Sequence, residues 1–63
     1  MSGRGEILVE FVVNGNFVKV SALDPVTGVE AVVIGPASAP RATMTAAVMR
    51  KLDYMLKKKK GGE

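Results

Sequence analysis

Two turn signals divide the first half of the chain into three short segments of β-forming residues. Each segment is six to eight residues long and is dominated by Val, Ile, Leu and Phe, a composition typical of strands. Asn-Gly favours a tight hairpin turn because both positions accept a positive φ, whereas Asp-Pro-x-x-Gly is typical of a longer turn. The segments are residues 6–13, 17–23 and 29–34, and the turns are Asn14-Gly15 and Asp24-Pro25-Val26-Thr27-Gly28.

The second half of the chain is helical after a loop at residues 35–40. Its apolar residues recur at the spacing of one helix face: Met44, Val48, Leu52 and Met55. The order β-β-β-α predicts an α+β fold, a three-stranded antiparallel β-meander in the order 1-2-3 with one C-terminal α-helix packed diagonally on one face.

We expect a single domain over residues 6–59, with a disordered lead at 1–5 and a disordered tail at 60–63. The helix start has two candidates, since Pro40 can occupy the first helical position and Thr43 can serve as the N-cap. The earlier start is favoured.

The turn lengths also predict the strand register. With Asn14-Gly15 as a two-residue loop, Phe11 faces Val18 and Glu10 faces Lys19, so apolar residues pair and the charges are opposite. A three-residue loop would place Phe11 opposite Lys19, which is unfavourable.

A four-residue loop at residues 25–28 then aligns Ala22 with Ala31 and Val20 with Val33. One sheet face is therefore predicted to form the core with Ile7, Val9, Phe11, Val18, Val20, Ala22, Ala31 and Val33.

The opposite sheet face is unusually apolar for a surface that one helix cannot cover. Adjacent apolar side chains on three strands indicate a candidate interaction patch. The competing interpretation is that small proteins expose scattered aliphatic residues without function. The two edge strands, 6–13 and 29–34, offer a second route to pairing with another chain. The candidate patch is Leu8, Val12, Phe17, Leu23, Val32 and Ile34.

The positive charge lies at the C-terminus. The net charge is +3, but residues 50–63 alone hold six basic and two acidic residues. Lys57, Lys58, Lys59 and Lys60 are candidate anion contacts, for nucleic acid or another polyanion. Nucleic acid is the weaker interpretation, since cations also stabilise a helix C-terminus and this run has no interleaved aromatic or arginine residues.

Catalysis is not expected. The chain has no histidine and no cysteine, so no imidazole activates its hydroxyl groups, and its carboxylates are scattered. We therefore predict no enzyme, catalytic residue, metal, cofactor or small-molecule substrate. The longest apolar run is Ala31-Val32-Val33-Ile34, far short of a membrane span, and no secretory signal is visible. The expected location is the cytoplasm.

Three segments of the chain resemble a small family of uncharacterised alphaproteobacterial proteins of unknown function. They are Gly15-x-x-Val18-Lys19-Val20-x-Ala22-x-Asp24-x-x-Thr27-Gly28-x-Glu30, Gly35-Pro36-x-x-Ala39 and Arg50-Lys51-Leu52-x-Tyr54. The resemblance implies a stand-alone bacterial cytoplasmic protein and carries over no activity, ligand or site residue. The predicted function is a non-enzymatic protein-interaction module, a homodimer being one form of it, with weak polyanion binding as the alternative.

Overall fold

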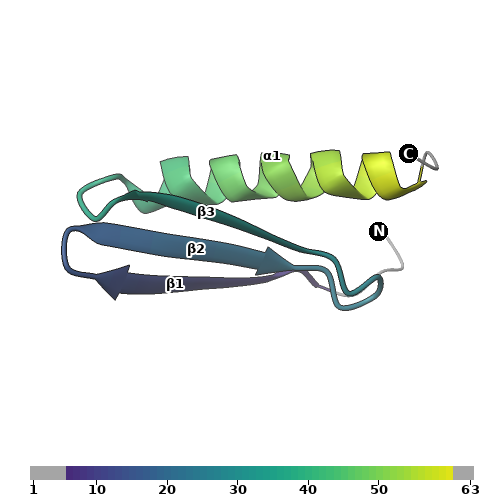
Figure 1. Cartoon of the computed structure of the whole chain (residues 1–63), viewed down its shortest axis with the longest axis horizontal. Coiled ribbons are helices and arrows are strands. Elements are labelled where there is room, and N and C mark those ends of the chain that lie inside the picture. The colour runs from purple at the N-terminus through teal and green to yellow at the C-terminus, as the bar shows by residue number, and fades with distance from the viewer. Residues whose placement is uncertain (1–5, 61–63) are drawn as a thin grey trace.

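A computed structural model describes the backbone of residues 6–60 and the side chains of residues 6–58. It contains the strands β1 (Leu8–Asn14), β2 (Phe17–Leu23) and β3 (Glu30–Pro36) and the helix α1 (Arg41–Lys60). The three strands form one antiparallel sheet in the order β1-β2-β3, and α1 packs against it (Figure 1). The α+β fold predicted from the sequence is confirmed. The predicted disordered segments lie outside the described residues, except that the backbone of Lys60 is helical.

The first hairpin turn differs from the prediction by one residue, and the β1–β2 register by two. Asn14 is the last residue of β1 and pairs with Phe17, so the loop is Gly15-Asn16 rather than Asn14-Gly15. Gly15 takes the positive φ of +63° that the turn requires. Phe11 consequently faces Val20, not Val18. The ladder runs from Leu8–Leu23 to Asn14–Phe17.

The shift also separates the predicted ion pair. Glu10 faces Ser21, and Lys19 faces Val12, so the two charges are not opposite each other. Because side chains alternate with a period of two, a two-residue shift leaves every side chain on its predicted face.

The β2–β3 register is as predicted, with Ala22 opposite Ala31 and Val20 opposite Val33. Asp24 shapes the connecting loop: its Oδ1 accepts the N–H of Val26 at 2.9 Å and its carbonyl accepts the N–H of Gly28 at 2.7 Å. Gly28 adopts the positive φ of +79°. The buried Asp24 is thus a turn residue with a structural partner.

Helix α1 begins at Arg41, close to the earlier of the two predicted starts. The Pro40 carbonyl accepts the N–H of Met44 at 3.1 Å, so Pro40 lies at the N-cap and not at the first helical position. Thr43 lies inside the helix. Proline suits a position whose N–H has no intrahelical partner.

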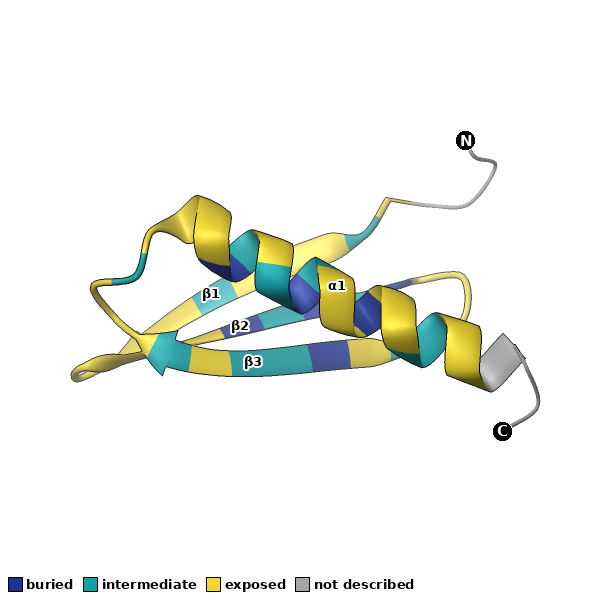
Figure 2. Cartoon of the chain, turned by 90° about the horizontal axis from the view of Figure 1, so that it is seen from above, coloured by how far each residue is buried: buried dark blue, intermediate teal, exposed yellow. Residues whose placement is uncertain are grey.

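The core lies between α1 and the predicted face of the sheet. Its buried residues come from β2, β3 and α1: Val18, Val20, Ala22, Ala31, Met44, Val48 and Leu52. The helix crosses the sheet diagonally, and its close packing is against β3 and β2 (Figure 2). Strand β1 contributes no fully buried residue, and Val9, predicted to be core, is 38% exposed. The single helix does not span the full width of the sheet.

Candidate functional site

The six residues of the predicted interaction patch share the uncovered face of the sheet. Phe17 and Ile34 are the most exposed, at 61% and 67%. Leu8 and Val12 are also exposed, whereas Leu23 and Val32 are half-buried. The patch therefore exists as a set of side chains on one side of the sheet.

Polar side chains interrupt the apolar surface of this face. Every row of paired residues across the three strands contains at least one polar or charged residue. The rows are Leu8–Leu23–Glu30, Glu10–Ser21–Val32, Val12–Lys19–Ile34 and Asn14–Phe17–Pro36. A partner lying flat on this face would have to cover Lys19 on the central strand, which is costly for an unpaired charge.

The face that contacts the helix is apolar in every row, and it is incompletely covered. Its rows are Val9–Ala22–Ala31, Phe11–Val20–Val33 and Val13–Val18–Gly35. At the β1 end of these rows Val13 is 65% exposed, Val9 is exposed and Phe11 is half-buried. Strand β1 thus shows apolar side chains to solvent on both of its faces.

Two loop hydrogen bonds show which backbone groups of β1 point outward. The N–H of Asp24 donates to the Val29 carbonyl at 2.9 Å, and the N–H of Ala37 donates to the Asn16 carbonyl at 2.8 Å. The even-numbered residues of β2 therefore face β3 and its odd-numbered residues face β1, since an antiparallel residue directs both groups to one side. It follows that Val9, Phe11 and Val13 direct their N–H and C=O groups away from the sheet.

The other edge, on β3, is partly protected. The same alternation turns Glu30, Val32 and Ile34 outward, and Lys51 Nζ reaches down from α1 to donate to the Val32 carbonyl at 2.8 Å. At the end of β3, Pro36 has no N–H, and its carbonyl accepts the N–H of Ala39 at 3.0 Å. Lysine and proline are common means of blocking sheet edges.

Strand β1 has no comparable protection among the residues that the structure describes. No side chain of residues 6–58 donates to its outward carbonyls. The nearest basic group is Arg41, whose guanidinium carbon lies 4.4 Å from the centre of the Phe11 ring, over its face. Glu10 is the one charged residue within the strand. The candidate site is therefore the whole of β1.

Of the four lysines at the end of α1, Lys57 and Lys58 have described side chains, and both interact with other side chains of the helix. Lys57 Nζ lies 3.6 Å from Asp53 Oδ2, an exposed ion pair one helical turn apart. Lys58 Nζ lies 5.8 Å from the ring centre of Tyr54. The side chains of Lys59 and Lys60 lie outside the described part. The structure thus gives the described lysines partners within α1.

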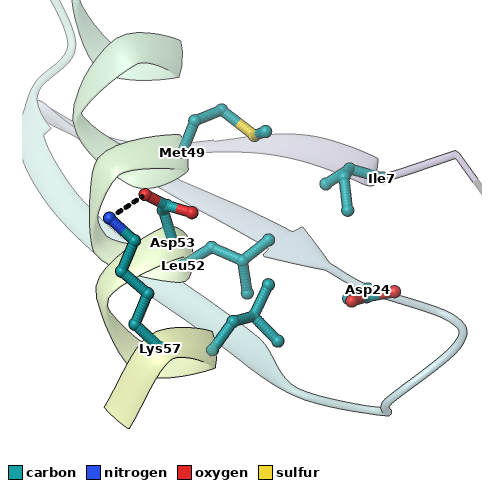
Figure 3. Close-up of a pocket in the computed structure, with 7 residues that line it drawn as sticks. Ile7, Asp24, Met49, Leu52, Asp53 and Lys57 are labelled. Atoms are coloured by element: carbon teal, nitrogen blue, oxygen red, sulfur yellow. Dashed lines mark ion pairs between the residues drawn. The ribbon is translucent and has the colours of Figure 1, made fainter. Parts of the chain in front are cut away.

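A hollow of about 270 Å³ lies between the C-terminal half of α1 and the start of the sheet (Figure 3). Most of its lining is aliphatic, from Ile7, Met49, Leu52 and Leu56, and Asp24 lies across it from Asp53. Asp53 pairs with Lys57 and Asp24 with the backbone of its own turn. Within residues 6–60 no group of three potential metal ligands occurs. The hollow carries no recognisable catalytic arrangement.

Sequence reasoning found the exposed face but missed Val9 and Val13 as exposed residues. Alternation shows which face a side chain occupies, but it does not show how many strands one helix covers. A helix is about 10 Å wide and strands lie about 4.8 Å apart, so one helix covers about two strands. Comparing the width of a helix with the spacing of the strands would have predicted that one edge strand stays exposed.

A family model described as "Domain of unknown function (DUF6898)" matches residues 4–59. The chain belongs to this family. No curated protein and no solved structure matches the chain. In the described part of the chain, no helix has the length and apolarity needed to cross a membrane. Family membership assigns no activity to the chain.

Proposed function

We propose that this chain is a non-enzymatic protein-interaction module of the cytoplasm that binds through strand β1. One observation carries the proposal: β1 is open to solvent on both faces and along its edge although five of its seven residues are apolar. Six of the seven are exposed, and only Phe11 is half-buried.

Strand addition is the binding mode that suits this surface. A partner strand laid along β1 would accept from and donate to the outward groups of Val9, Phe11 and Val13, while its side chains cover apolar residues on both faces. Burying the exposed part of Val13 and its neighbours supplies the hydrophobic contribution. The main-chain hydrogen bonds fix direction and register.

The absence of histidine and cysteine from the chain supports a non-enzymatic role. The buried Asp24 and the paired Asp53 already have partners, so neither is poised as a free acid or base.

Site-specific photo-cross-linking in the cells that produce the protein tests the proposal. A photoreactive amino acid is placed at Val13 in β1 or, as a matched control, at Val26 in the loop after β2. The two valines are 65% and 63% exposed, so they differ in location and not in accessibility. We expect a discrete protein adduct from position 13 and none from position 26. Equal adducts from both positions, or none from either, would contradict the proposal.

A further inference from the structure

We infer that the strand bound by β1 is β1 of a second copy of this chain. The two strands pair antiparallel around a two-fold axis, forming a six-stranded sheet in the order β3-β2-β1-β1-β2-β3 with both helices on one face. This inference rests on the proposed function, because it takes β1 to be the binding strand and names its partner.

The backbone pattern restricts the register of such a pair. Only Val9, Phe11 and Val13 direct their hydrogen-bonding groups outward, so these residues must face one another across the interface. A register centred on Phe11 aligns all seven residues of β1 with all seven of the second copy. A register centred on Glu10 or on Val12 aligns only five. Strand length therefore favours Phe11 on the two-fold axis.

Charge favours the same register. Centring on Glu10 would place the two carboxylates directly opposite each other, which destabilises a strand pair. Centring on Phe11 places Glu10 opposite Val12 of the second copy, and Val12 is the neighbour of Lys19 on β2. Glu10 of one copy and Lys19 of the other then share one row, about 10 Å apart along the sheet with one strand between them. The long side chain of Lys19 can bring its ammonium group closer to the Glu10 carboxylate.

On the helix side, the same register extends the apolar rows into the second copy. Phe11 meets Phe11, and Val9 meets Val13, so each incompletely covered row gains an apolar neighbour. One contact opposes this gain, because the two Arg41 guanidinium groups approach each other above the Phe11 pair. Arg41 is exposed in each copy, so the surrounding water screens this repulsion.

One edge strand per copy makes a small interface, below the range of about 1,200–2,000 Å² typical of stable complexes. We therefore expect a dimer in exchange with monomer, with a dissociation constant between about 1 μM and about 1 mM.

Molecular mass measured against concentration, by sedimentation equilibrium, gives the first test. We expect the mass to rise from 6.6 kDa toward twice that value as the concentration increases. Val13→Pro removes one outward N–H and leaves the bonds to β2 intact, so it should abolish the dimer. Val13→Thr, the matched control, keeps the N–H and the branched shape and should retain it.

Disulfide trapping gives the second test, and it does not depend on whether the proline variant folds. The natural chain has no cysteine, so every disulfide reports an introduced pair. Val9→Cys and Val13→Cys chains are oxidised separately and as a mixture. In the inferred register residue 9 of one copy faces residue 13 of the other, so the mixture should form the crossed disulfide and neither variant should cross-link efficiently alone. Efficient Val9→Cys homodimers, or a dimer without the crossed product, would overturn the register.

The two proposals fail in different ways. A mass of 6.6 kDa at chain concentrations up to about 1 mM would overturn self-pairing. If the position-13 photo-adduct then contains a different protein, β1 remains the binding strand and only its partner was misidentified. If position 13 gives no specific adduct, the proposed function also fails.

Discussion

Strands β1 and β3 are the two edges of one sheet, but they present different surfaces to solvent. Lys51 reaches from α1 to the Val32 carbonyl on β3, and Pro36 ends that strand without an N–H. Strand β1 has Val9 and Val13 exposed beside outward backbone groups. The difference follows from dimensions, because one helix covers about two strands and must leave the third open. A three-stranded meander with a single helix therefore tends to have one protected edge and one open edge.

The largest predicted effect is the loss of stability from a substitution in the core, compared with the loss from a substitution on β1. Leu52 is 1% exposed in the core between α1 and the sheet, so Leu52→Ala should destabilise the fold by about 3 kcal/mol through lost burial and a residual cavity. Val9→Ala on β1 should cost less than about 1 kcal/mol, because Val9 is already 38% exposed. Urea denaturation of both variants at a concentration where the chain is monomeric makes the comparison. Equal losses would show that β1 is as well packed as β2 and β3.

The second prediction uses the two ends of one row, Val13–Val18–Gly35. A Cβ at Gly35 would lie 2.9 Å from Cε and Sδ of Met44, so Gly35→Val should cost about 1 kcal/mol as the flexible end of the Met44 side chain shifts. Val13→Phe enlarges the open end and should change the free energy of unfolding by less than about 0.5 kcal/mol. Thermal unfolding of the two variants measures the difference. A larger loss for Val13→Phe than for Gly35→Val would contradict the helix position.

The smallest predicted effect concerns the protection of β3. Lys51→Ala removes the hydrogen bond to Val32 and should cost about 0.5–1 kcal/mol, since the contact is exposed. It should also open the second edge, so that dimers joined through β1 associate further through β3. Lys51→Arg, which keeps a donor of similar reach, should behave as the natural chain does. Light scattering that shows no species larger than a dimer for Lys51→Ala would mean that Lys51 does not protect this edge.

The fold was predictable because several independent patterns agreed. Turn residues separated the strands, apolar spacing identified the helix, and the loop at residues 25–28 fixed the β2–β3 register. The β1–β2 register was predicted wrongly, since Asn14-Gly15 and Gly15-Asn16 are both plausible turns and the sequence does not distinguish them. The assignment of faces survived this error because the shift was two residues.

The candidate site was predictable only in part. The pattern placed Leu8, Val12, Phe17 and Ile34 on the exposed face, where the structure has them. It also placed Glu10 and Lys19 on that face, but opposite each other in one row, whereas the register puts them in two different rows. It could not show that Lys51 reaches Val32, which lies 19 residues away in the sequence. The assignment of Val9 to the core assumed a helix wide enough to cover three strands.

Hydrogen exchange of the β1 amides at several chain concentrations tests the central claim most directly. The amides of Val9, Phe11 and Val13 point away from the sheet, whereas those of Glu10 and Val12 are bonded to β2. We predict that the first three exchange rapidly in dilute solution and become protected as the chain is concentrated, while Glu10 and Val12 are protected throughout. Amides of Val9, Phe11 and Val13 that exchange equally fast at every concentration, up to about 1 mM, would contradict pairing of β1 with a second copy.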